Sequence, residues 1–131
     1  RFEPGKSPMS TMAPTMVFNE EGDLMLVTGS PGGSLIPAAI LRVITGVVDF
    51  NLDIGQATML PRVHKDWPTT GILYERTLNS DVVRIINKTI GHKMTPEHTM
   101  GSTQSIHIID GINYGFADLR RPNASVSIQP N

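Results

Sequence analysis

The chain has 131 residues, the length of one ordinary domain, and with 39% hydrophobic and 18% charged residues its composition is that of a globular protein. Its net charge of −1 provides no electrostatic basis for binding nucleic acid or an anionic membrane, so we expect neither as a partner. The absence of cysteine excludes disulfides, thiolate catalysis and zinc–cysteine sites, but it leaves the cellular compartment open.

The first part of the chain predicts an irregular start followed by a β-hairpin. Residues 1–13 are rich in proline, serine, methionine and glycine and show no periodicity. Two apolar runs follow, Pro14–Phe18 and Leu24–Thr28. The polar residues 19–23 between these runs favour a hairpin turn.

A glycine-rich break and a long apolar helix are predicted next. The sequence Gly29-Ser30-Pro31-Gly32-Gly33 ends the second strand, and Ser34 is expected to cap a helix that reaches Phe50, with Pro37 in its first turn. Apolar residues occupy nearly every face of this helix, so we expect it to be covered on most sides. The helix is interrupted by polar residues and is too short for a bilayer, so no membrane span is expected.

The remaining sequence predicts two helices and three strands. They are a helix over Asp53–Met59 capped by Asp53, a strand over Ile72–Arg76, a helix over Asn79–Ile90 closed by Gly91, and strands over Gln104–Ile109 and Ile112–Ala117. Asp110-Gly111 favours a type I′ turn between the last two strands. The polar tail over 120–131 is expected to be loose. This order predicts an α+β fold in which helices pack on antiparallel strands, as a single domain that needs further chain as cover.

The glycine-rich segment has two interpretations of roughly equal weight. Glycines lack a Cβ atom and let backbone N–H groups converge on an anion, and the following helix N-terminus adds a positive dipole end. The other interpretation is a tight strand-to-helix turn. A phosphate-binding loop is disfavoured because no Gly-Lys-Ser/Thr follows, and the Gly-x-Ser-x-Gly pattern is absent. An oxyanion hole is therefore the better functional candidate.

The irregular start carries a cluster of hydroxyl groups at Ser7, Ser10, Thr11 and Thr15. Such groups either bind a carboxylate or, more commonly, satisfy their own backbone. The four histidines lack the spacing of a metal site, and we expect no metal or other cofactor. His64–Trp67 is either a polar site beside an aromatic wall or, preferably, a surface loop with Trp67 partly buried. Asp118–Arg121 either binds an anion or faces solvent, as short charge clusters usually do.

Several motifs in succession resemble those of the gamma-glutamyltransferase family. Residues 8–15, Pro-Met-Ser-Thr-Met-Ala-Pro-Thr, are similar to the family's Pro-Leu-Ser-Ser-Met-x-Pro-Thr, and Gly29–Ser34 resembles its glycine turn. Residues 57–64 are similar to Ala-x-x-x-Pro-Arg-x-His, residues 91–93 to Gly-His-Lys, residues 100–105 to Met-Gly-Ser-x-Gln-Ser, and residues 114–122 to Tyr-Gly-x-Ser-Asp-Pro-Arg-Arg-Pro. The resemblance spans about residues 6–122, which makes chance similarity implausible.

The resemblance implies that residues 1–131 are the C-terminal part of the small subunit of a gamma-glutamyltransferase. It implies the four-layered αββα fold of N-terminal-nucleophile hydrolases, of which this chain supplies some strands and helices. That family cleaves gamma-glutamyl amide bonds, such as that of glutathione, through a gamma-glutamyl-threonine intermediate, and transfers the glutamyl group to water or to an amino acid or peptide acceptor. The remaining segments of a self-cleaving precursor are expected as partners, in a periplasmic or extracellular enzyme.

The resemblance also implies roles for individual residues. Ser10 and Thr11 would bind the α-carboxylate of the glutamyl group, and the N–H groups of Gly32 and Gly33 would stabilise the oxyanion, with Gly33 also contacting the substrate. No nucleophile is expected here, because Arg1 lies downstream of the family's threonine. Thr11 replaces the family's second serine and adds a methyl group that stiffens χ1.

Two other functions remain open. One is a related enzyme on the same scaffold, either a cephalosporin acylase or a polyglutamate-processing transpeptidase. The other is a non-catalytic module that binds anions at the glycine turn.

Overall fold

The main sheet of the protein has four antiparallel strands. A computed structural model describes residues 3–8, 10–68 and 71–129. The strands are β1 (Thr15–Phe18), β2 (Leu24–Gly29), β6 (Gln104–Ile109) and β7 (Ile112–Ala117), in the order β1-β2-β6-β7. Both predicted hairpins are present. The second turns at Asp110 and Gly111 with φ values of 51° and 76°, the left-handed pair that a type I′ turn requires.

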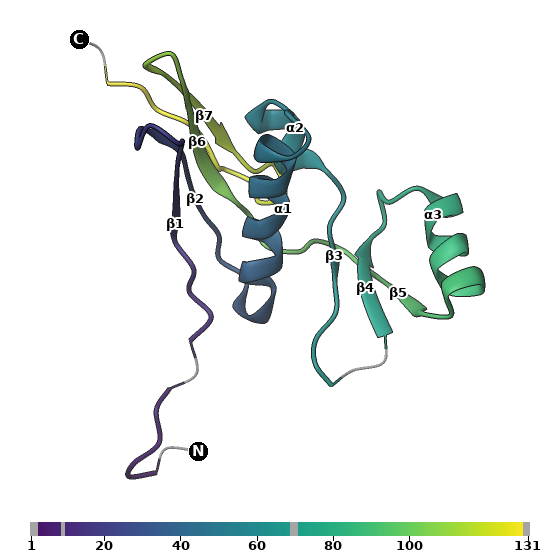
Figure 1. Ribbon diagram of the computed structural model, residues 1–131. Coiled ribbons are helices and arrows are strands. Elements are labelled where there is room, and N and C mark those ends of the chain that lie inside the picture. Colours follow the sequence, from purple (N-terminus) through teal and green to yellow (C-terminus); the bar gives the residue numbers. More distant parts are fainter. Residues whose placement is uncertain (1–2, 9, 69–70, 130–131) are drawn as a thin grey trace.

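Two helices cover one face of the main sheet and form the core with it (Figure 1). They are α1 (Ile36–Val48) and α2 (Ile54–Met59). The buried core consists of Leu26 from β2, Val43 and Val47 from α1, and Ile54 and Ala57 from α2. Burial of these side chains supplies the main stabilising free energy of this part of the fold.

The start of α1 differs from the prediction. Gly33–Leu35 forms a single 3-10 turn and α1 begins at Ile36, so Ser34 does not cap the helix as predicted. The 3-10 turn precedes α1, and Leu35 takes the N-cap position without a side-chain cap. Pro37 lies in the first turn, as expected. Leu41 and Val48 are 60% and 49% exposed, so the described residues do not cover α1 on most sides.

The short helix α2 follows its sequence signals closely. The Asp53 side chain accepts a hydrogen bond from the Gln56 N–H at 2.8 Å, and the Gln56 side chain accepts one from the Asp53 N–H at 3.4 Å. This reciprocal pair is a capping box, which satisfies two otherwise unpaired backbone donors at the helix start.

A second, smaller sheet lies beside the main one, and α3 lies next to it (Figure 1). Its strands are β3 (Val63–His64), β4 (Gly71–Glu75) and β5 (Lys93–Glu97). The predicted helix over 79–90 is α3 (Ser80–Ile85) continued by a π-turn, Ile86–Ile90, with Asn79 as its N-cap and Gly91 in the left-handed conformation at its end.

Two features of the small sheet correct the prediction. β3 and β5 were not predicted, and β4 and β5 pair in parallel, contrary to the antiparallel expectation. β3 has only two residues and β5 contains Pro96, which lacks a backbone N–H, so neither has a normal strand signal. The parallel pairing depends on α3 as the crossover between β4 and β5.

The tail after β7 is irregular but lies against the sheet. A Cβ atom at Gly115 would come within 2.7 Å of a Val126 methyl carbon, so this glycine leaves room for the tail. The expectation of a loose tail is therefore wrong for this part of it. Within residues 3–8, 10–68 and 71–129, no helix is long and apolar enough to cross a membrane.

Candidate functional site

The glycine turn, which we define as Gly29–Gly33, joins β2 to the 3-10 turn before α1. Gly32 has φ 144° and ψ 13°, and Gly33 has φ 58°, both positive values that side-chain-bearing residues rarely adopt. Among the described residues, neither the Gly32 N–H nor the Gly33 N–H donates a hydrogen bond to another protein atom. Gly33 is exposed, and a Cβ atom added there would meet no atom within 4 Å. The turn thus has two backbone donors without a partner among the described residues, on a half-buried Gly32 and an exposed Gly33.

The hydroxyl segment, residues 10 and 11, reaches this turn. The Thr11 hydroxyl donates a hydrogen bond of 2.6 Å to the Gly33 carbonyl oxygen, across 22 residues of sequence. Ser10 is exposed, and among the described residues its oxygen accepts only a long bond of 3.4 Å from the Met12 N–H. The structure therefore brings Thr11 and Gly33 together. Thr15, in contrast, donates to its own local backbone at the Ala13 carbonyl oxygen, 3.0 Å away.

A buried ion cluster of Arg62, Glu75, Asp118 and Arg120 joins the two sheets. Arg62 donates to Asp118 at 2.7 Å, and Arg120 donates to both carboxylates, to Glu75 at 2.6 Å and to Asp118 at 3.2 Å. These four side chains are between 0% and 8% exposed. The prediction that Asp118–Arg121 faces solvent is thus wrong for Asp118 and Arg120. Arg62 and Glu75, which pair with Asp118 and Arg120, lie more than 40 residues away from them in sequence, so local pattern gave no signal of these pairs.

The ion cluster keeps both carboxylates charged. Burial opposes the charged form of Glu75, but hydrogen bonds from Arg120 and from the Met100 and Arg62 N–H groups outweigh it and lower its pKa. Burial acts in the same way on Asp118, and the Arg120 N–H, the Arg62 charge and the Thr103 N–H together lower its pKa. Two cations and two anions therefore balance inside the protein.

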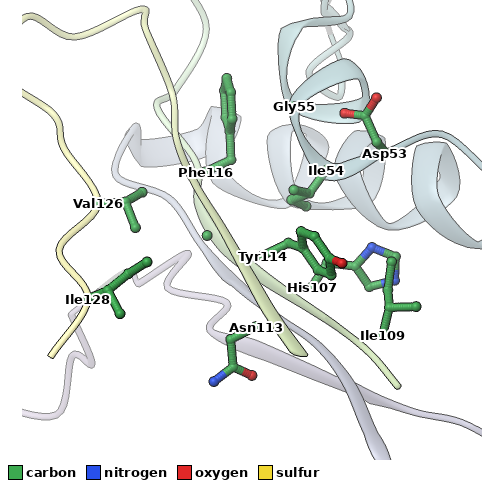
Figure 2. Close-up of a pocket in the computed structure, with 11 residues that line it drawn as sticks. Asp53, Ile54, Gly55, His107, Ile109, Asn113, Tyr114, Phe116, Val126 and Ile128 are labelled. Atoms are coloured by element: carbon green, nitrogen blue, oxygen red, sulfur yellow. The ribbon is translucent and has the colours of Figure 1, made fainter. Parts of the chain in front are cut away.

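A cleft of about 660 Å³ lies at the edge of the main sheet (Figure 2). Its lining is mainly apolar and comes from the start of α2, from β6 and β7, and from Val126 and Ile128 of the tail. Asp53 is engaged as a helix cap, and burial lowers the pKa of His107, which favours the neutral ring. No residue of the glycine turn or of the hydroxyl segment lines this cleft. Its lining offers no charged pair for catalysis.

The remaining polar candidates do not converge on a site. The His64 ring and the Asp66 carboxylate lie 2.7 Å apart, and Trp67 is 95% exposed, which corrects the expectation that it is partly buried. Trp67 lies in the β3–β4 connection, where the described residues leave its indole uncovered. Within the part of the chain that the structure describes, no cluster of His, Cys, Asp or Glu is arranged to hold a metal ion.

The fold is that of part of the N-terminal-nucleophile hydrolases, of α+β architecture, of whose layers the main sheet and its helices form two. The structure superposes on a gamma-glutamyltranspeptidase mutant from Helicobacter pylori with a TM-score of 0.84 and 33% identity, covering 92% of this chain and 66% of that one. The sequence profile of the gamma-glutamyltranspeptidase family matches residues 1–128. The chain belongs to this family.

Two relatives are glutathione hydrolase proenzymes. The protein from Escherichia coli is 38% identical over 118 residues, which cover 89% of this chain and 20% of the relative. The protein from Bacillus subtilis is 32% identical over 129 residues, which cover 96% of this chain and 22% of the relative. The chain therefore spans about a fifth of the length of these relatives.

Proposed function

We propose that this chain is the C-terminal part of the small subunit of a gamma-glutamyltransferase, where it supplies the carboxylate-binding and oxyanion elements. The observation that carries the proposal is the 2.6 Å hydrogen bond from Thr11 to the Gly33 carbonyl oxygen, which joins the two candidate segments. Together they combine the exposed hydroxyl of Ser10 and the turn-bound hydroxyl of Thr11 with two backbone donors that have no partner among the described residues. Family membership supports the same chemistry.

The two segments have different tasks in this proposal. Ser10 donates a hydrogen bond to the α-carboxylate of the glutamyl group, and charge-assisted bonds of this kind are stronger than neutral ones. A hydroxyl group donates only one hydrogen, so Thr11 has to release the Gly33 carbonyl in order to donate to the carboxylate. Thr11 therefore couples carboxylate binding to the conformation of the glycine turn.

The Gly32 and Gly33 N–H groups stabilise the tetrahedral intermediate. A threonine oxygen from another segment of the precursor attacks the gamma-glutamyl carbonyl carbon, its proton passes to the threonine's own α-amino group, and the carbonyl oxygen becomes the oxyanion. The C–N bond then breaks, the leaving amine takes the proton, and a gamma-glutamyl ester remains. Water or an acceptor amine, from an amino acid or a peptide, resolves this ester. No cofactor takes part.

The remaining parts of the proposal concern the complete protein. The partners are gamma-glutamyl compounds such as glutathione, together with the other large- and small-subunit segments of a precursor that cleaves itself. The proposed location is periplasmic or extracellular. Neither nucleic acid nor a metal ion has a role in this scheme.

The test is a hydrolysis assay of the complete protein that contains this chain. We expect it to release the chromophore from a gamma-glutamyl anilide and to release glutamate from glutathione. A cephalosporin-type acyl substrate and a gamma-linked polyglutamate are the comparison substrates. Preference for either of these, or lack of turnover on all of them, would reject the proposed function.

A further inference from the structure

The back of the glycine turn packs against a second loop, Met100–Thr103, which we call the backing loop. The Ser30 hydroxyl donates to the Pro31 carbonyl oxygen at 2.8 Å and accepts a hydrogen bond from the Ser102 N–H at 3.0 Å. Ser30 thus ties the turn's own backbone to the backing loop, 72 residues away in sequence.

The two backbones approach each other too closely for a side chain between them. A Cβ atom at Gly101 would lie 2.8 Å from the Ser30 oxygen and 3.1 Å from the Ala39 Cβ atom. A Cβ atom at Gly32 would lie 3.2 Å from the Gly101 Cα atom. Gly101 also has φ 71°, which a side-chain-bearing residue rarely adopts. The contact between the turn and the backing loop is therefore specific to these residues.

The backing loop is itself fixed by the ion cluster. The Met100 N–H donates to Glu75 at 2.9 Å, and the Met100 carbonyl oxygen accepts a bond from Arg62 at 2.6 Å. The Thr103 N–H donates to Asp118 at 2.9 Å. Met100, Ser102 and Thr103 are 2% or less exposed. The loop is a rigid support, because its backbone groups are held by buried charges on both sides.

We infer that Ser30 and Gly101 are positioning residues for the oxyanion hole, and this inference rests on the proposed function. Backbone donors stabilise an oxyanion only if they lie about 2.7–3.1 Å from the position where the charge develops. Gly32 is half-buried and Gly33 is exposed, and neither has a side chain that could fix its backbone, so the direction of their N–H groups depends on the contacts behind the turn. Ser30 holds it through the Ser102 N–H, and Gly101 permits the approach.

The first experiment compares Ser30→Ala with Ser34→Ala in the complete protein. Ser34 is an exposed serine in the same segment and serves as the matched control. We expect Ser30→Ala to lower kcat about tenfold and to change KM less than about twofold. The reason is that displacing a donor reduces the stabilisation of the transition state more than the binding of the substrate. Ser34→Ala should keep the wild-type kcat.

A second readout separates positioning from general stability. The probe is a boronic acid that carries the glutamyl α-amino and α-carboxylate groups; the attacking hydroxyl oxygen adds to boron, its proton passes to the base, and a tetrahedral boronate anion forms. We expect Ser30→Ala to lower the affinity for this probe by the same factor as it lowers kcat. The affinity for free glutamate should stay unchanged. An equal loss for both ligands would overturn the positioning role.

The two positions should also be coupled. In Gly101→Ala the new methyl group presses on the Ser30 oxygen, and Ser30→Ala removes that oxygen. The kcat loss of the double variant is therefore expected to be smaller than the product of the two single losses. Simple multiplication of the losses would overturn the coupling. If Ser30→Ala does not fold, Gly101→Ala carries the boronate comparison and is judged by the same criterion.

The outcomes also distinguish this inference from the proposed function. A wild-type protein without turnover on a gamma-glutamyl anilide rejects the function itself. An active wild type in which Ser30→Ala behaves like Ser34→Ala rejects only the positioning role.

Discussion

Ser10 and Thr11 are adjacent hydroxyl residues with different environments. Ser10 is exposed and, within the described part of the chain, makes only a long bond to the Met12 N–H, whereas Thr11 donates to Gly33 at 2.6 Å. This difference separates the effects that we expect when each hydroxyl is removed.

Ser10→Ala should raise KM about tenfold or more and leave kcat nearly unchanged, since a charge-assisted hydrogen bond contributes roughly 1.5–3 kcal/mol. Thr11→Ala should raise KM less than Ser10→Ala, because Thr11 gives up its bond to the Gly33 carbonyl when it donates to the carboxylate. Thr11→Ser keeps the hydroxyl and is the control. Steady-state kinetics on a gamma-glutamyl anilide measures both constants. Unchanged kinetics in both alanine variants would rule out the carboxylate role.

Gly33 is the position at which a side chain tests the oxyanion donors. Gly33→Val should lower kcat at least about 100-fold, the scale of losing one oxyanion donor. A Cβ atom there meets nothing within 4 Å, so the loss has to come from the φ of 58°, which valine avoids by moving the N–H groups. Circular dichroism of the purified variant checks that it folds. A folded Gly33→Val protein with normal turnover would contradict the oxyanion role.

The ion cluster acts at the level of elements, because it links the end of α2, the small sheet and the segment after β7. Arg120 donates to the Thr58 and Leu60 carbonyl oxygens and to Glu75, and Arg62 donates to the backing loop. The cluster thus fixes the two sheets relative to each other. It also supports the backing loop, against which the glycine turn packs.

Arg120→Met should destabilise the complete protein by about 3–5 kcal/mol, because it leaves a buried carboxylate without its partner. Arg84→Met is the matched control. Arg84 pairs with Asp81 at 2.9 Å, but both side chains are more than 60% exposed, so the loss should stay below about 1 kcal/mol. Chemical denaturation of both variants gives the comparison. Equal stability losses would show that the cluster is not a stabilising element.

The lowered pKa values of Glu75 and Asp118 give the cluster a defined acid sensitivity. Their contribution to stability is fully present above the unfolded-state pKa values of about 4, and it is lost as the pH falls toward the lower pKa values of the folded state. The melting temperature should therefore fall below about pH 4.5, and Glu75→Gln should reduce this dependence. A melting temperature that stays constant between about pH 5 and pH 3 would contradict the assignment.

At the scale of the whole molecule, apolar surface remains uncovered on both layers. On the sheet face opposite α1, Met16 and Ile106 flank Val27 in register and are 63% and 45% exposed. On the helix layer, Leu41 and Phe50 are 60% and 65% exposed. Two packed sheets between two helix layers would bury these surfaces, in agreement with the proposal that other segments of a precursor complete the fold.

Residues 1–131 alone should therefore show no gamma-glutamyl-transferring activity. A carboxylate clamp and an oxyanion hole bind a transition state, but they form no acyl-enzyme without an attacking group. The measurement is anilide hydrolysis by the isolated chain, repeated after the other precursor segments are supplied. Turnover by the isolated chain would overturn the proposed division of roles.

Signals of short range determined much of the local structure. Asp53 with Gln56 specified the capping box, Asp110-Gly111 specified the hairpin, and Gly91 marked the end of the helix. The motif resemblance gave the family, which the comparisons confirm. It also selected Ser10, Thr11, Gly32 and Gly33, whose roles stay predictions. These features depend on a few neighbouring residues or on an inherited sequence pattern, so the sequence alone contains them.

Only the tertiary structure decided the contacts between distant segments. One such contact is the parallel pairing of β4 with β5, which are separated by a crossover. Others are the bond from Ser102 to Ser30 and the buried contacts of Asp118 and Arg120 with distant residues. A charged residue looks alike in sequence whether it faces solvent or a buried partner. Its environment depends on which surfaces the folded chain brings together, because the free energy of burying a charge is set by the partner that neutralises it.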